Sequence, residues 1–239
     1  MITYSCKIAC APIRLEQSDK SEMISQLLFG ETFKIIKTTK SWKRIKTHDG
    51  YEGWIDPRVI ANTKAVIKEK CYVNKLWAHV ISSGMEMFVP YGSELNPEKD
   101  EFSIHDFTFV TKSGPEKIIQ DALLFLNTPY LWGGRSSFGV DCSGLMQVLA
   151  KVNGYTLARD ASQQVNSGKA VEYGKHNIGD LAFFQDESGK IVHVGILSAK
   201  DEIIHASGWV RSDLFDEKGI LVESSGLYSH HLACIRRIF

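Results

Sequence analysis

The stretch YLWGGRSSFGVDCSG, residues 130–144, decides the fold expected for this chain. Its first part is a glycine-rich loop, and its last part places Cys142 directly before an apolar pattern with helical spacing. Two apolar, strand-like runs follow, Ile191–Ile196 and Ile203–Ala206, and each carries one histidine. A thiol at the start of a helix, with histidines on nearby strands, is typical of a cysteine hydrolase.

Cys142 stands where the helix is expected to begin. Unpaired backbone N–H groups and the positive end of the helix dipole favour a thiolate there. With a nearby imidazolium, such surroundings can lower a cysteine pKa from about 8.5 to about 3.5–7.5. The alternative is a buried structural cysteine, which the polar neighbours Asp141 and Ser143 disfavour. We therefore predict Cys142 as the nucleophile.

The two histidines are candidates for the base and its orienting partner. Strand alternation places His193 and Gly195 on one face of their run and three aliphatic side chains on the other. The glycine leaves room beside His193, which suits a general base, although a structural histidine fits the strand equally well. His205 follows in the next run, where a neutral imidazole can fix the tautomer of the base.

The glycine loop has the properties of a cleft wall. Its glycines, among them Gly133 and Gly134, permit sharp turns and close approach of backbone to substrate. It lacks the lysine of a phosphate loop. Tyr130 could offer its hydroxyl near a developing oxyanion, beside the backbone N–H of Cys142.

Composition excludes several function classes. The 239 residues carry 28 Lys+Arg and 28 Asp+Glu, and the resulting zero net charge does not favour nucleic acid. No basic segment followed by an apolar one marks a leader, and no apolar run is long enough to span a membrane. Five scattered cysteines do not form a disulfide framework, which favours a reducing compartment. His230, His231 and Cys234 resemble a fragment of a metal site, but no second ligand pair stands at zinc-like spacing. We expect no metal and no cofactor.

Three regions are expected along the chain. Residues 1–60 alternate as short strands, with Asp49-Gly50 as a hairpin signal, and predict a small β-barrel. Residues 61–112 are expected to form a second small β subdomain or a linker. Residues 113–239 begin with helical spacing and continue as strands, which predicts an α+β domain with helices packed on an antiparallel sheet.

Four ordered motifs in residues 113–239 resemble one family. They are YLWGG (130–134), DCSG (141–144), HVGI (193–196) and IHA (204–206). Together they are similar to the NlpC-type papain-like cysteine peptidases of bacteria. The resemblance implies a papain-like α+β catalytic domain in which Cys142 is the nucleophile, His193 the base and His205 the orienting residue. It also implies that Asp141, Ser143 and Asp160 contact substrate.

The N-terminal part sharpens this resemblance. Residues 21–31 and the sequence DGYEGW, residues 49–54, look like a bacterial SH3-like domain. The pairing resembles the γ-D-glutamyl-L-diamino-acid endopeptidases, which cut stem peptides with a free N-terminal L-Ala. In them the SH3-like domain closes one end of the cleft, and a tyrosine and an acid hold the amine. Tyr51 matches the tyrosine, and Glu22 is the expected acid, with Glu16 as the alternative.

The leading expectation is therefore a cysteine endopeptidase of released cell-wall peptides, acting as a cytoplasmic monomer in murein recycling. Its partners would be peptidoglycan stem peptides, with no nucleic acid and no membrane. One alternative is a wall-bound hydrolase whose SH3-like part serves as a tether. Two others are a non-catalytic cell-wall binding module and a thiol acyltransferase on the same scaffold.

Overall fold

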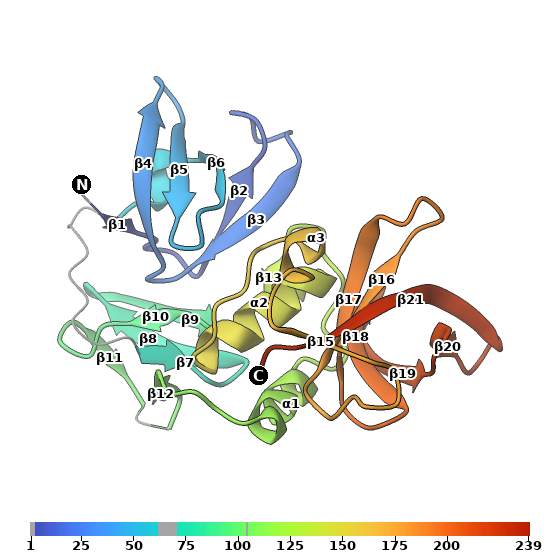
Figure 1. Cartoon of the computed structure of the whole chain (residues 1–239). Coiled ribbons are helices and arrows are strands. Elements are labelled where there is room, and N and C mark those ends of the chain that lie inside the picture. The colour runs from blue at the N-terminus through green and yellow to red at the C-terminus, as the bar shows by residue number, and fades with distance from the viewer. Residues whose placement is uncertain (1–2, 62–70, 104) are drawn as a thin grey trace. The chain divides into compact units, whose positions relative to one another are not determined.

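The computed structural model describes residues 3–61, 71–103 and 105–239 (Figure 1). The chain divides into two compact units. Unit 1 comprises Met1–Thr111 and Leu131–Gly139, and unit 2 comprises Lys112–Tyr130 and Val140–Phe239. Within the described ranges, no helix is both long and apolar enough to cross a membrane.

Unit 1 begins with a six-stranded antiparallel sheet in the order β1-β4-β5-β6-β2-β3. Its strands are β1 (Tyr4–Ser5), β2 (Cys10–Arg14), β3 (Met23–Leu28), β4 (Thr32–Thr38), β5 (Lys43–Thr47) and β6 (Glu52–Ile55), followed by the 3-10 helix η1 (Pro57–Val59). The predicted turn at Asp49-Gly50 joins β5 to β6, and Gly50 takes a φ of 87°, which suits glycine. Alternate side chains such as Ile13, Phe33 and Ile45 form the buried core of this sheet.

The rest of unit 1 forms two three-stranded antiparallel sheets, β10-β7-β12 and β11-β8-β9. The strands are β7 (Cys71–Val73), β8 (Trp77–Ser82), β9 (Met85–Pro90), β10 (Glu94–Leu95), β11 (Asp100–Phe102) and β12 (Phe107–Phe109). A second buried cluster, which includes Val73, Val80 and Leu95, supports them. Part of the subdomain expected over 61–112 falls on residues 62–70 and 104, outside the described residues.

Unit 2 contains a seven-stranded antiparallel sheet in the order β15-β21-β16-β17-β18-β19-β20. The strands are β15 (Lys169–Val171), β16 (Leu181–Gln185), β17 (Ile191–Leu197), β18 (Glu202–Ser207), β19 (Trp209–Phe215), β20 (Gly219–Val222) and β21 (Leu227–Arg237). Since β21 also pairs with β20, the strands from β16 to β21 close into a barrel, and β15 extends it at β21. Two further strands, β13 (Arg135–Ser136) and β14 (Gly139–Val140), pair with each other in a separate two-stranded sheet.

The helices of unit 2 are few and short. They are α1 (Pro115–Leu124), α2 (Cys142–Val152) and α3 (Ala161–Gln164), with 10, 11 and 4 residues. α2 is buried along its whole length and packs against β17 and β18. Strands thus dominate the described chain, and the predicted picture of helices layered on a sheet fits only loosely. The expected boundaries near residues 60 and 112 stay a prediction.

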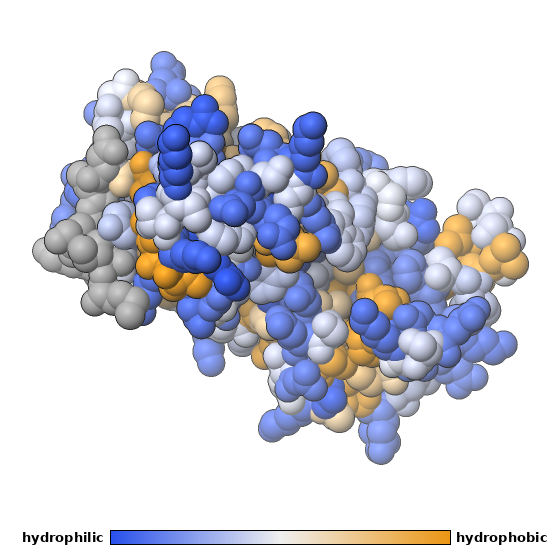
Figure 2. Space-filling view, turned by 90° about the horizontal axis from the view of Figure 1, so that it is seen from above, coloured by the Kyte–Doolittle hydropathy of each residue, from blue (hydrophilic) through white to orange (hydrophobic). Residues whose placement is uncertain are grey.

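The surface carries the mixture expected of a globular protein. On the face shown in Figure 2, apolar residues are interspersed among polar and charged ones. Apolar atoms contribute more than half of a typical protein surface, so isolated apolar side chains there need no special account.

Candidate active site

Cys142 is the first residue of α2, as the sequence predicts. Asp141 caps the helix, because its Oδ1 accepts a hydrogen bond of 2.7 Å from the backbone N–H of Gly144. The thiol is buried, and the expected low pKa is wrong for the free protein. Burial raises the pKa of Cys142 to about 11, and the Asp141 carboxylate raises it further. Hydrogen bonds from the Val194 and Ser143 backbone oppose this without overcoming it.

Asp141 and Ser143 belong to a buried network around Arg159, which sequence reasoning missed. Arg159 forms an ion pair with Asp141, and its Nη1 lies 3.0 Å from both Asp141 Oδ1 and Ser143 Oγ. Ser143 Oγ donates to the same Asp141 oxygen at 3.2 Å. The network fixes the entry into α2, and therefore fixes Cys142. An arginine next to the predicted Asp160 was the available signal.

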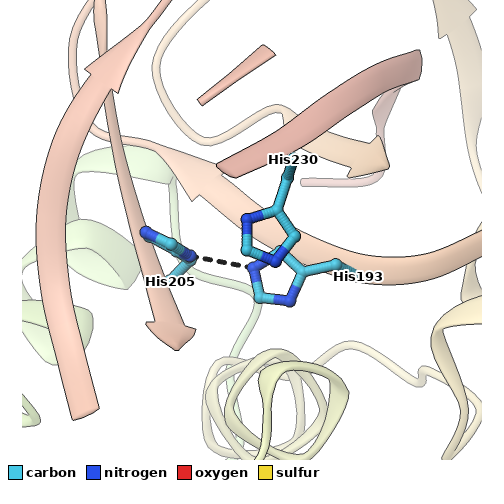
Figure 3. A group of neighbouring side chains, drawn as sticks. All are labelled: His193, His205 and His230. Carbon is cyan, nitrogen blue, oxygen red and sulfur yellow. Dashed lines mark hydrogen bonds between the residues drawn. The ribbon is translucent and has the colours of Figure 1, made fainter. Parts of the chain in front are cut away.

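His193 and His205 lie side by side, as the sequence predicts. Nε2 of His193 is 2.8 Å from Nδ1 of His205, and both imidazoles are buried (Figure 3). In the register of β17 and β18, Gly195 stands opposite His205, so His193 and His205 are diagonal neighbours on one face. That face also carries a buried apolar cluster that includes Phe184 and Ile203.

Gly195 supplies the space that the pair needs. A Cβ on Gly195 would lie 2.9 Å from the Cβ of His205 and 2.7 Å from Cδ1 of Ile203, closer than carbon atoms normally approach. The sequence prediction of room beside His193 is therefore met, but the room holds a protein side chain rather than a ligand.

Asp213 and Arg211 extend the pair, and sequence reasoning missed both. Nε2 of His205 lies 2.8 Å from Oδ2 of Asp213, and Nε of Arg211 donates to the same oxygen at 2.7 Å. Both residues lie on β19, beside β18, with His205 opposite Arg211. The only available signal was their alternation along the strand after His205.

His230, on β21, stacks on His193. The two ring centroids are 4.0 Å apart and the ring planes differ by 24°. Burial and the neighbouring His205 and Arg211 lower the pKa of His230 to about 4. Burial, together with His230 and His205, lowers the pKa of His193 well below its usual value. Both rings are therefore neutral at neutral pH, and His193 is available as a base.

The three histidines could be considered as metal ligands, because one nitrogen from each lies within 4.8 Å of the others. Two observations favour a hydrogen-bonded cluster instead. The facing nitrogens of His193 and His205 already share a hydrogen bond. The lone pairs of His193 and His230 lie in nearly parallel stacked planes, and such lone pairs do not converge on the roughly 2 Å shell that zinc requires.

Tyr130 and Asp160 both belong to unit 2. Burial raises the pKa of Tyr130 to about 12, and the charges of Cys142 and Asp141 raise it further. The backbone N–H of Tyr130 donates a hydrogen bond of 3.0 Å to the carbonyl oxygen of Gly208. Asp160 is the N-terminal cap residue of α3.

Glu22 lines a cavity of about 860 Å³ within unit 1. Its Oε1 accepts a hydrogen bond of 2.7 Å from Nε1 of Trp132, in the glycine loop. Arg14, Gln26 and Trp132 line the same cavity, whereas Glu16 and Tyr51 are not among its described lining residues. Sequence reasoning missed this contact between Trp132 and Glu22.

The glycine loop is anchored in unit 1 by a buried ion pair. Nη1 and Nη2 of Arg135 each lie 3.0 Å from an oxygen of Glu31, and the pair is almost completely buried. Gln26 binds the loop twice, through its side chain and its backbone carbonyl. A Cβ on Gly133, whose φ is 76°, would lie 2.3 Å from the carbonyl oxygen of Met23. The close approach predicted for the glycines is therefore to the protein itself.

Comparison with known proteins bears out the resemblance. Residues 127–226 match the NlpC/P60 family, and residues 13–58 match the bacterial dipeptidyl-peptidase SH3 domain. The chain is 30% identical to a γ-D-glutamyl-L-lysine dipeptidyl-peptidase of Bacillus subtilis (strain 168), over 90% of this chain and 81% of that protein. A protein of the same name from Bacillus cereus (strain ATCC 10987) is 25% identical, over 83% of this chain and 72% of its own length.

Solved structures show the same fold. A crystal structure of an NlpC/P60 family protein from Bacillus cereus ATCC 10987 superimposes with a TM-score of 0.86 at 20% identity, covering 98% of this chain and 99% of the other. An NlpC/P60 endopeptidase from Photobacterium damselae gives a TM-score of 0.70 at 14% identity, over 97% and 70%. With a bacterial SH3-type domain before its catalytic part, the chain belongs to the NlpC/P60 family of cysteine peptidases.

Proposed function

We propose that this protein hydrolyses the bond between γ-D-glutamate and a diamino acid in cell-wall stem peptides with a free N-terminal L-Ala. The observation that carries the proposal is the buried pair of His193 and His205, 2.8 Å apart, beside the helix that begins at Cys142. The names of the Bacillus relatives, γ-D-glutamyl-L-lysine dipeptidyl-peptidase, support the substrate class.

The first half of the reaction forms a thioester. Sγ of Cys142 attacks the γ-carbonyl carbon of D-glutamate while its proton passes to Nδ1 of His193, the nitrogen not bonded to His205. Because burial raises the pKa of Tyr130 to about 12, the phenol keeps its proton at neutral pH and can donate to the oxyanion. The backbone N–H of Cys142 is the second donor. His193 then protonates the departing amine as the C–N bond breaks.

The second half releases the dipeptide. A water molecule gives a proton to His193 and attacks the thioester carbon, and the thiolate of Cys142 leaves and is reprotonated. The products are L-Ala-γ-D-Glu and the peptide or free amino acid that begins with the diamino acid. Because both the thiol and the imidazole are neutral in the free protein, His193 has to act as a general base rather than as a preformed imidazolium.

We assign recognition of the free amine to unit 1. A buried ammonium needs paired acceptors, so a site built with them rejects peptides whose amine is blocked. Glu22 is the supported acid, because its carboxylate lines the cavity and is oriented by Trp132. Tyr51 remains the proposed second contact, on its motif alone. We propose that Asp160 contacts substrate, and that Asp141 and Ser143 do so beside their bonds to Arg159.

The deciding experiment is mass spectrometry of the products from L-Ala-γ-D-Glu-L-Lys, its diaminopimelate analogue and their N-acetylated forms. We expect release of L-Ala-γ-D-Glu from the free-amine peptides only, and no product with Cys142→Ala. Equal cleavage of the acetylated peptides would favour the wall-bound hydrolase instead. If Cys142→Ala cleaves normally, the nucleophile assignment is wrong.

Glu22→Gln, with Glu16→Gln as its matched control, tests the amine site. We expect Glu22→Gln to raise KM for free-amine peptides by roughly 10- to 100-fold, the effect of losing one charged hydrogen bond. Glu16→Gln is expected to change KM little. The reverse result would move the amine site to Glu16.

A free-amine requirement also bears on where the enzyme acts, because such peptides arise once the wall polymer has been taken apart. We propose a role in recycling these peptides in the cytoplasm. Fractionation of cells that produce the protein, followed by assay of each fraction, tests this; activity confined to the wall fraction would overturn it.

A further inference from the structure

A series of hydrogen bonds joins His193 to His205 and His205 to Asp213 on β19. His193 Nε2, His205 Nδ1, His205 Nε2 and Asp213 Oδ2 follow one another, with 2.8 Å at each of the two contacts between residues. The three side chains are diagonal neighbours on β17, β18 and β19, so one face of three paired strands holds the whole series. His193 and His205 are buried, and the side chain of Asp213 is 12% exposed.

We infer that Asp213 is a positioning residue that sets the tautomers of both histidines, so that Nδ1 of His193 carries the lone pair which takes the Cys142 proton. This inference rests on the proposed function for its catalytic consequence, but not for the tautomers themselves.

The charge state of Asp213 determines which nitrogen of His205 carries a hydrogen. Burial acts to raise the pKa of Asp213, but the hydrogen bond from His205, together with the charge and hydrogen bond of Arg211, outweighs it and lowers that pKa. The carboxylate is therefore ionised at neutral pH and can only accept hydrogen bonds. Nε2 of His205 must then be the donor. With His205 neutral, its Nδ1 is left as an acceptor.

The tautomer of His205 in turn determines the tautomer of His193. Since Nδ1 of His205 accepts, Nε2 of His193 must carry the hydrogen. His193 is neutral, because its pKa is lowered well below the usual value. Its Nδ1 is consequently unprotonated and basic. With the opposite tautomer, Nδ1 of His193 would carry a hydrogen and could not accept the thiol proton.

Arg211 completes the arrangement from the far side. Its Nε donates to the same oxygen that His205 contacts, at 2.7 Å, and its guanidinium lies over the ring of Trp209, 5.0 Å from the centroid. The carboxylate is thus oriented by a side chain that is itself held in place. The remaining titratable neighbours of the cluster are His230 and His231 on β21.

The test combines a tautomer readout with kinetics on the full chain. Long-range ¹H–¹⁵N spectra of histidine-labelled protein distinguish Nδ1–H from Nε2–H rings without any substrate. We expect both His193 and His205 to be Nε2–H in the wild type at pH 7. A wild-type spectrum with His205 protonated at Nδ1 would overturn the inference.

Asp213→Asn and Arg211→Gln follow, with Asp216→Asn as the matched control. Asp216 is a carboxylate in the turn after β19, and it accepts hydrogen bonds from the Tyr228 hydroxyl and the Lys218 backbone N–H. We expect Asp213→Asn to lower kcat by roughly 10- to 100-fold with little change in KM, and to alter the His205 nitrogen shifts. Arg211→Gln should give a smaller change in the same direction, and Asp216→Asn none.

The outcomes separate the two proposals. If Asp213→Asn folds but leaves kcat and the nitrogen shifts unchanged, Asp213 has no positioning role. If Asp213→Asn does not fold, Arg211→Gln decides, because unchanged shifts and kcat in that variant would also contradict the inference. A wild-type protein that shows the expected tautomers but cleaves no stem peptide would leave the tautomer assignment standing and overturn the proposed function alone.

Discussion

His230 lies face to face with His193, with ring centroids 4.0 Å apart and planes 24° apart. The stacked ring therefore covers one face of the His193 imidazole, while His205 meets its edge. In the proposed reaction His193 becomes a cation, and a neutral aromatic ring over a cation is stabilising. A protonated His230 would repel it instead.

We expect His230→Ala to lower kcat by about 2- to 30-fold at pH 7, the range of a cation–π contact. His230→Phe keeps a ring at the same place and is expected to retain most of the activity. It should also lose less activity than the wild type as the pH falls toward 4, because it cannot become charged. The measurement is kcat against pH for the three proteins. If His230→Phe loses as much of kcat at pH 7 as His230→Ala does, the stacked ring does not contribute to catalysis.

Acid should destabilise the protein through the same two rings. The pKa of His230 is lowered to about 4 and that of His193 also lies below its usual value. Between about pH 6.5 and about 4 the unfolded chain therefore binds protons that the folded state does not, and the free energy of unfolding falls as the pH falls. Urea unfolding at a series of pH values checks this, and His230→Phe should flatten the slope. A free energy of unfolding that rises toward pH 4.5 would contradict the assigned shifts.

Alkylation of Cys142 should be slow at neutral pH. Burial raises the pKa of the thiol to about 11, so the reactive thiolate is a small fraction at pH 7, and the rate should climb about tenfold per pH unit. Peptide mass spectrometry after iodoacetamide treatment measures the rate at this site. Cys6, which is buried, and Cys10, which is partly buried, have pKa values raised to about 12 and serve as internal comparisons. A rate independent of pH between 6 and 8 would reveal a preformed thiolate–imidazolium pair.

Arg135→Met should destabilise unit 1 strongly. It removes the partner of the buried Glu31 carboxylate, and breaking a buried pair in this way costs about 3–5 kcal/mol. The exposed pair of Arg44 and Glu52 provides the control, because Arg44→Met should cost only about 0–1 kcal/mol. Urea unfolding gives both values. Similar small costs for the two variants would mean that Glu31 is compensated by other groups.

Gly195→Ala should harm both folding and turnover. The added Cβ would lie 2.9 Å from the Cβ of His205, so the ring pair has to shift, and overpacking of this kind costs about 1–3 kcal/mol. Gly114→Ala is a suitable control, because a Cβ there meets only the end of the Glu116 side chain. We expect kcat to fall in the first variant and to be unchanged in the second. If Gly195→Ala is fully active, His205 does not need its observed place.

The sequence was sufficient to place residues whose position follows from local pattern. Cys142 at a helix start and His193 and His205 on successive strands could be placed because helix caps and strand alternation are local properties. The pKa of Cys142 could not, because burial by the whole fold outweighs the helix dipole that the local pattern reveals.

His230 and Asp213 show what local pattern leaves out. His230 reaches His193 only because β21 pairs with β16, and the register of β16 slips by one residue between Phe183 and Phe184. Asp213 depends on the diagonal from β18 to β19. Such contacts depend on strand pairing and register, which a single sequence does not specify. The barrel closure by β20 and β21 was missed for the same reason.

The placement of Leu131–Gly139 in unit 1 has a consequence for inheritance. The chain crosses between its units three times, after Thr111, after Tyr130 and after Gly139. Modules joined end to end can be exchanged by a single genetic recombination, but here such an exchange would separate Arg135 from Glu31 and leave the loop without its anchor. The SH3-type part and this loop of the peptidase must therefore change together, as one unit of descent.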